Sequence, residues 1–212
     1  HGSVLQMVNH GLSTGALFAL VGMLYERYHT RQIVDMSGLA ARLPWLAFFM
    51  VFFTFSSIGV PGLNGFAGEF LILLGNFQRA WTGSPPALTV HLVTIAVLAV
   101  TGIMLGAWYM LWLVQRLFFG PLKEPRPHAG AQHAHDEHDD HHVADLDLRE
   151  ILALAPLAVF VLWIGIRPHD FLKPMTPTLE QARAKAAAIV DKKATTSAAL
   201  TLAEPQTPTP NP

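Results

Sequence analysis

The chain has 212 residues, of which 51% are hydrophobic and 14% are charged, and its formal net charge is −1. This apolar balance is typical of membrane proteins, and a charge near zero gives no indication of a nucleic-acid partner. The sequence contains no cysteine, which excludes disulfides and thiolate-bound iron–sulfur clusters in this chain. It also lacks the glycine-rich motifs of dinucleotide and P-loop sites.

Four apolar regions approach the roughly 20 residues that a membrane-spanning helix needs. They lie at about 3–25, 44–77, 87–118 and 151–166. The pattern predicts an all-α, polytopic membrane helix bundle. The second region is too long for one straight span, so we expect it to be broken. Because the sequence begins inside an apolar run, we also expect it to be a fragment of a longer protein.

Basic residues and proline indicate how the rest of the chain is organised. Lysine and arginine gather in the connections 26–43 and 119–150, which we expect to face the cytoplasm. Residues 173–212 read as a polar tail. We expect a surface helix at 178–195, followed by a disordered end, because repeated prolines and polar residues cannot bury a core.

The stretch VPGLNGFAGEF, at 60–70, interrupts the second apolar region. Pro61 has no N–H to donate, and glycines such as Gly62 permit unusual backbone dihedral angles. Non-helical backbone at membrane depth is tolerated only where it is buried in protein or lines a wet cavity. We therefore predict a discontinuous helix, broken near 60–66. Such breaks recur in transporters, where they build ion sites.

Titratable residues occur next to this break and in the first apolar region. Glu69 follows the break, and an acid within the membrane indicates a functional site by default. Gln6, His10 and Thr14 recur at four-residue spacing, which places them on one face of a helix. Histidine titrates near neutral pH, so we predict a proton relay of Glu69 and His10. The alternatives are a solvated interfacial Glu69 and a His10 that only joins two helices by a hydrogen bond.

Two segments resemble a specific family: QMVNHGLSTGALFALVGMLYERYHTR at 6–31 and GVPGLNGFAGEFLILLGNF at 59–77. They are similar to the C-terminal part of chain M, the NADH dehydrogenase subunit 4 family, of respiratory complex I (NADH–quinone oxidoreductase). The resemblance covers residues 1–172. It implies an antiporter-like, proton-translocating membrane subunit with broken helices, whose activity is coupled to quinone reduction in partner subunits.

The resemblance also implies roles for individual residues. His10 and Glu69 match the family's titratable relay residues, with Gln6 and Thr14 beside them. Arg27 matches the arginine of the family's ERxHTR segment, and the GVPG motif of the break contains the proline and glycine named above. The sister chains L and N usually carry lysine where Glu69 stands, so the acid favours chain M.

Partners and cofactors follow from the same resemblance. The implied partners are the other membrane subunits of complex I, including the sister chains L and N, within a lipid bilayer. The chain itself is expected to hold no cofactor and no redox site. FMN, iron–sulfur clusters and quinone would be bound by partner subunits of this translocating enzyme, in the bacterial inner membrane.

The connection 121–148 is rich in histidine and aspartate. Imidazole and carboxylate groups at short spacing can bind Zn²⁺ or Ni²⁺, but irregular spacing and low complexity favour a solvated loop. The weak ligand candidates are His128, His133, His135, His138, His141 and His142.

Two other functions remain open. One is a subunit of a cation/proton antiporter or of a membrane-bound hydrogenase, against which the ERxHTR segment argues. The other is a metal-ion transporter that collects zinc with the histidine-rich loop. The transporter predicts paired ligands such as H-x-x-x-D within the spans, and the sequence contains none there.

Overall fold

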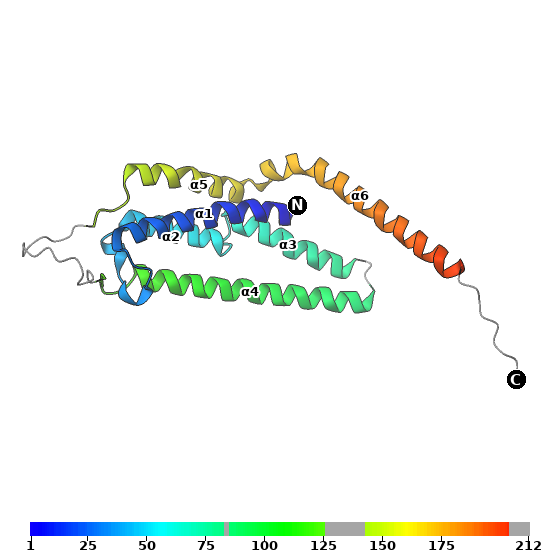
Figure 1. Cartoon of the computed structure of the whole chain (residues 1–212), viewed down its shortest axis with the longest axis horizontal. Helices are drawn as coiled ribbons and strands as arrows, with labels where there is room; N and C mark the ends of the chain where they lie inside the picture. The colour runs from blue at the N-terminus through cyan, green and yellow to red at the C-terminus, as the bar shows by residue number, and fades with distance from the viewer. Residues whose placement is uncertain (83–84, 126–142, 204–212) are drawn as a thin grey trace, which may run out of the picture.

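The computed structural model describes residues 1–82, 85–125 and 143–203. These residues form α1 (Gly2–Tyr28), α2 (Pro44–Ser57), α3 (Asn64–Trp81), α4 (Pro86–Phe118), α5 (Leu148–Ile166) and α6 (Pro168–Ala203), with the short 3₁₀ helices η1 (Ile33–Asp35) and η2 (Leu39–Ala41) between α1 and α2. Helices α1 to α5 lie side by side in an elongated bundle, and α6 extends beyond it (Figure 1). This arrangement confirms the predicted all-α bundle.

Three described helices are long and apolar enough to cross a bilayer by length and composition: Gly2–Tyr28, Leu88–Phe118 and Leu148–Ile166. Helix α2 is apolar but has only 14 residues. At a rise of 1.5 Å per residue it covers about 21 Å, which is less than the roughly 30 Å of hydrocarbon in a bilayer. The end of α2 and the break after it are therefore expected at membrane depth.

The predicted discontinuous helix is present, with α2 and α3 as its two halves. The backbone between them turns at Gly59 and Gly62, whose φ angles of 74° and 92° favour glycine. Two N–H groups in this turn have backbone partners: Val60 donates to the carbonyl of Phe55 at 3.1 Å, and Leu63 donates to that of Val60 at 3.1 Å. Internal pairing of this kind is what allows irregular backbone inside a membrane protein.

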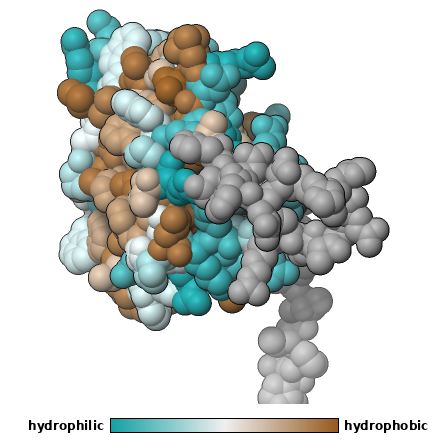
Figure 2. Space-filling model, turned by 90° about the vertical axis from the view of Figure 1, so that its left-hand side faces the viewer, coloured by the Kyte–Doolittle hydropathy of each residue, from teal (hydrophilic) through white to brown (hydrophobic). Residues whose placement is uncertain are grey.

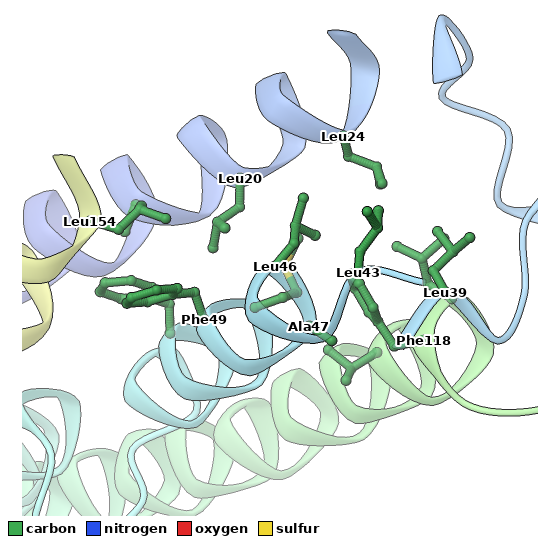
Figure 3. Packing of buried hydrophobic residues seen from close by; sticks show 14 of the residues in the cluster. Leu20, Leu24, Leu39, Leu43, Leu46, Ala47, Phe49, Phe118 and Leu154 are labelled. Carbon is green, nitrogen blue, oxygen red and sulfur yellow. The ribbon is translucent and has the colours of Figure 1, made fainter. Parts of the chain in front are cut away.

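The buried core gathers at one end of the bundle, where α1, α2 and the end of α4 meet. Figure 3 shows leucine and phenylalanine side chains from these elements pointing toward one another. Fully buried members include Leu20, Leu43, Leu46 and Phe118. Lipid tails are as apolar as these side chains, so the hydrophobic effect does little to hold helices together in a bilayer. The large apolar side chains here instead stabilise the bundle by close van der Waals packing between helices.

The segment before α5 is held to this same end of the bundle. The carboxylate of Asp145 accepts hydrogen bonds from the N–H groups of Trp45 at 2.7 Å and Leu46 at 3.2 Å, in the first turn of α2. Asp147 caps α5 and forms a capping box with Glu150. Capping satisfies N–H groups that have no partner within their helix.

The last helix differs in extent from the segment expected at 178–195. Helix α6 begins at Pro168, directly after α5, and contains Pro174 and Pro177. Proline suits the first position of a helix, so Pro168 starts α6 without cost. Pro174 and Pro177 would ordinarily interrupt a helix, which favours a later helix start. The helix is nevertheless continuous through them, and the hydroxyl of Thr176 donates to the carbonyl of Leu172. Residues 204–212 lie outside the described residues.

Candidate functional site

Glu69 lies in the second turn of α3, against the break between α2 and α3. Its half-buried carboxylate accepts a hydrogen bond at 3.3 Å from Nε2 of Gln6, on α1. The other carboxylate oxygen faces Gly59, where an added Cβ atom would lie 2.5 Å from Oε2. Gly59 also has a φ of 74°, so glycine is required there for two reasons. The break therefore provides the space that the acid occupies.

The orientation of Gln6 is determined by Asn9, one turn further along α1. Nδ2 of Asn9 donates to Oε1 of Gln6 at 3.2 Å. With its oxygen engaged, the Gln6 side chain presents its NH₂ group to Glu69. Gly68 permits this approach, since a Cβ atom there would overlap Oε1 of Gln6. Helices α1 and α3 thus meet through polar side chains with defined donor and acceptor ends.

Asn9 also connects α1 to both sides of the break. Its Nδ2 donates to the carbonyl of Asn64 at 2.7 Å, and Nδ2 of Asn64 donates to the carbonyl of Asn9 at 3.4 Å. Oδ1 of Asn64 accepts from the hydroxyl of Ser56, in the last turn of α2, at 2.6 Å. Asn9 and Asn64 are 1% and 0% exposed, so these bonds form away from water. They hold the two half-helices against α1.

The structure brings together some of the predicted site residues and separates others. Gln6 and Glu69 are in direct contact. His10 is exposed, and its Nδ1 lies 3.1 Å from the hydroxyl of Thr14. Among the described residues, His10 has no hydrogen bond with Glu69. The predicted polar face of α1 is therefore divided into a part that meets α3 and a part that does not.

Pro61 and Gly62 lie in the break itself, and both are exposed. Gly62 adopts a positive φ, and its carbonyl packs against Gly165 of α5, where an added Cβ atom would overlap it. These two residues shape the backbone next to the site, and among the described residues neither forms a hydrogen bond with the Glu69 side chain. All six histidines of the loop, and with them the possible metal site, lie outside the described residues.

Sequence reasoning missed the buried amide network of Asn9, Asn64 and Ser56. The available signal was a second four-residue spacing on α1, from Asn9 to Ser13, whose hydroxyl donates to the carbonyl of Asn9 at 2.7 Å. Both residues are buried, whereas His10 is exposed. Two polar rows run side by side on α1, and only packing shows which of them faces the protein.

Arg27 lies at the last turn of α1 and forms a second polar cluster at the core end of the bundle. Its Nη2 and Nη1 atoms are 2.6 Å and 3.0 Å from the two carboxylate oxygens of Glu150. It also donates to the carbonyls of Met23, Ala144 and Asp145. The guanidinium thus joins α1 to the start of α5, and the sequence analysis had not singled out Glu150 as its partner.

We expect Asn9→Ala to lower the free energy of unfolding by about 1–3 kcal/mol, because it leaves buried amide and carbonyl groups without their partners. Thermal unfolding of the purified protein in detergent would measure this. Thr14→Ala is the matched control, since it removes an exposed hydrogen bond from the same helix. Equal losses for the two variants would contradict a structural role for the buried network.

The segment that contains Glu69 matches a known protein family. A family model described as NADH:quinone oxidoreductase/Mrp antiporter, transmembrane, matches residues 1–99. Those residues contain α1, the break and Glu69. Residues 1–99 are therefore similar to this family. This match and the relatives below confirm the resemblance to the NADH dehydrogenase subunit 4 family.

Two individual proteins are similar to most of this chain. NADH-ubiquinone oxidoreductase chain 4 of Chondrus crispus is 39% identical over 171 residues, which cover 81% of this chain and 30% of that protein. NADH-quinone oxidoreductase subunit M of Rhodobacter capsulatus is 36% identical over 184 residues, or 85% of this chain and 31% of that protein. This chain therefore spans less than a third of the length of these relatives.

A solved structure supports the fold. Respiratory complex I from Thermus thermophilus with bound NADH contains a chain that matches with a TM-score of 0.63 and 30% identity. The match covers 83% of this chain and 32% of that chain. The bundle with its discontinuous helix is therefore antiporter-like, as predicted, and the chain is a multi-pass membrane protein.

Proposed function

We propose that this chain is part of a proton-translocating membrane subunit of an NADH:quinone oxidoreductase, respiratory complex I. In this proposal Glu69 and His10 carry protons, and quinone reduction in partner subunits drives the movement. The names of the relatives and the family match support the assignment. The position of Glu69 within a broken helix is the structural observation that carries it.

The surroundings of Glu69 suit reversible proton binding. The carboxylate lies between an uncharged amide donor, Gln6, and the backbone of Gly59, and no described basic side chain forms an ion pair with it. An acid without a fixed counter-ion exchanges its proton when a nearby charge or the local hydration changes. In the proposed cycle Glu69 is protonated, and it releases the proton towards the periplasmic side as its site hydrates.

His10 provides the second titratable group of the proposal. It stands four residues after Gln6 on α1, so the two side chains lie one turn apart on neighbouring positions of the helix surface. A water molecule between them would connect the imidazole with the donor that holds Glu69. The hydroxyl of Thr14 lies 3.1 Å from Nδ1 of the same ring.

The proposal includes partners that supply the redox chemistry. The chain has no cysteine, so thiolate-bound clusters would belong to other subunits. We propose that FMN, iron–sulfur clusters and quinone are held there, that the sister chains L and N are neighbours, and that the protein lies in a bacterial inner membrane. Residues 26–43 and 119–150 would face the cytoplasm, in agreement with their arginine and lysine content.

A cation/proton antiporter subunit is the second candidate, because the description of the matching family includes Mrp antiporters. The two functions differ in what drives the proton. Complex I pumps when NADH is oxidised, whereas an antiporter moves protons when a sodium gradient is imposed. Pumping that requires a sodium gradient and is indifferent to NADH would favour the antiporter.

The decisive variant is Glu69→Gln, which keeps the shape of the side chain and removes its titratable proton. We expect NADH-driven proton uptake into sealed membrane vesicles to fall by roughly 100-fold, the lower end of what a positioned acid–base group contributes. NADH:quinone turnover, followed in parallel, should slow because it is coupled to pumping.

Glu180→Gln is the control, since it removes an exposed carboxylate from α6, outside the candidate spans. It should pump like the parent protein. Wild-type pumping and turnover in Glu69→Gln would show that Glu69 is a structural group, and the relay built on the broken helix would then be abandoned.

A further inference from the structure

A cavity of about 500 Å³ lies at the core end of the bundle, away from Glu69. Its walls come from the connection that contains η1 and from the last turns of α4, with Lys123 just beyond. The lining residues are Ile33, Val34, Met36, Ser37, Trp112, Gln115, Arg116, Phe119 and Lys123.

The charged residues that line this cavity are both basic. Arg116 and Lys123 both line it, and no acidic residue is among its lining residues. Arg116 stacks over the ring of Trp112, with Cζ 5.5 Å from the ring centroid. Lys123 donates to the carbonyl of Val34 at 2.6 Å. Neither cation forms an ion pair with a carboxylate in the described part of the chain.

Backbone hydrogen bonds fix the wall of the cavity. Ser37 and Lys123 exchange two backbone hydrogen bonds of 2.9 Å in an isolated antiparallel bridge. Gly38 has a φ of 67°, and an added Cβ atom there would lie 2.6 Å from the carbonyl oxygen of Gly120. The two connections can approach closely only with glycine at this position. The bridge therefore holds Lys123 beside the end of α4.

The cavity opens where a candidate membrane span ends. Helix α4 is long and apolar enough to span the bilayer, and Arg116 lies in its last turn. Trp108, Tyr109 and Trp112 are 71%, 62% and 49% exposed near this end, as in the aromatic belts of membrane proteins. Figure 2 views this end of the bundle and shows hydrophobic and hydrophilic surface side by side.

We propose that this cavity binds the head group of an anionic phospholipid. Arg116 and Lys123 would contact the phosphate, because guanidinium and ammonium groups are strong donors to phosphate oxygens. Ser37 and Gln115 offer further hydrogen bonds to the head group. The acyl chains would lie along the exposed apolar side of α4, which includes Met104, Leu105 and Leu111.

The test measures lipid retention by the purified protein within its native complex, using native mass spectrometry after adding phosphatidylglycerol or phosphatidylcholine. The double variant Arg116→Gln/Lys123→Gln should bind phosphatidylglycerol about 25-fold more weakly, since each basic residue at an anionic surface contributes roughly fivefold. The control Arg149→Gln/Lys173→Gln removes two exposed cations outside the cavity and should bind like the parent.

Several outcomes would overturn the proposal: unchanged phosphatidylglycerol binding in the cavity variant, equal retention of phosphatidylcholine by the parent, or displacement of the lipid by millimolar inorganic phosphate.

A second measurement avoids charge changes altogether. Phosphatidylglycerol with brominated acyl chains should quench the parent's tryptophan fluorescence, and Trp112→Phe should lose part of that quenching. Identical quenching in both proteins would count against the site.

Discussion

Replacing Arg27 by glutamine is expected to lower the free energy of unfolding by about 3 kcal/mol, because removal of one partner from a largely buried ion pair leaves the other charge uncompensated. The side chains of Arg27 and Glu150 are only 13% and 17% exposed. The variant also loses the bonds from the guanidinium to the carbonyls of Ala144 and Asp145. The measurement is thermal unfolding in detergent, together with the amount of protein found in the membrane.

Two further variants make this test specific. Arg27→Lys keeps the charge but loses the fork that contacts both oxygens of Glu150, so an intermediate loss is expected. Arg167→Gln breaks a pair with Asp170 in which the arginine side chain is 71% exposed, and exposed pairs contribute only about 0–1 kcal/mol. If Arg27→Gln and Arg167→Gln destabilise the protein equally, the Arg27 cluster does not hold α5 to α1.

Gly59→Ala is expected to damage both stability and proton pumping. A non-glycine residue at a positive φ costs about 1–2 kcal/mol, and the new Cβ atom would lie 2.5 Å from Oε2 of Glu69. The carboxylate must then shift, and we expect this shift to disturb its hydrogen bond with Gln6. Pumping per NADH oxidised, measured in sealed vesicles, should therefore fall by more than the loss of stability alone explains.

Gly62→Ala separates these two effects. Gly62 also has a positive φ, of 92°, but an added Cβ atom there meets no atom within 4 Å. The variant carries the backbone strain of the break without the collision, so its stability should fall while its pumping declines less than in Gly59→Ala. Equal pumping by the two variants would show that contact between Gly59 and Glu69 has no part in proton transfer.

The proposed relay and the proposed lipid site occupy different parts of the fold, and they are tested independently. Glu69 sits where α2 and α3 meet α1, whereas the lipid cavity lies between η1 and the end of α4. A protein that lost lipid binding but retained Glu69-dependent pumping would support the relay alone. The reverse result would support the lipid site alone.

The sequence by itself determined the apolar helices and the break between α2 and α3, but not the full extent of α6. Apolar runs of membrane length predicted the helices, because a bilayer requires every backbone group to be paired within its own segment. The cluster of Gly59, Pro61 and Gly62 predicted the break for a local reason, since these residues cannot continue a regular helix as others do. Glu69 was conspicuous because an acid is rare in such surroundings.

Only the tertiary structure decided which polar residues meet. The spacing of Gln6, His10 and Thr14 predicted a shared face of α1. However, α1 carries a second polar row beside it, which contains Asn9 and Ser13. In the folded protein Asn9 and Ser13 are buried, whereas His10 is exposed. The rotation of α1 depends on contacts from distant segments, such as the glycine at 68 that admits Gln6. No local pattern contains that information.

The same distinction applies to Arg27 and Glu150, which lie 123 residues apart in the chain and form one ion pair. Read in sequence, Arg27 stands out only through the family resemblance, and Glu150 is an ordinary helix-end charge. They can pair because the segment before α5 lies next to the end of α1. Asp145 holds this segment in place, since its carboxylate accepts hydrogen bonds from the N–H groups at the start of α2. Local propensity specifies each helix, whereas long-range hydrogen bonds and packing specify how the helices face one another.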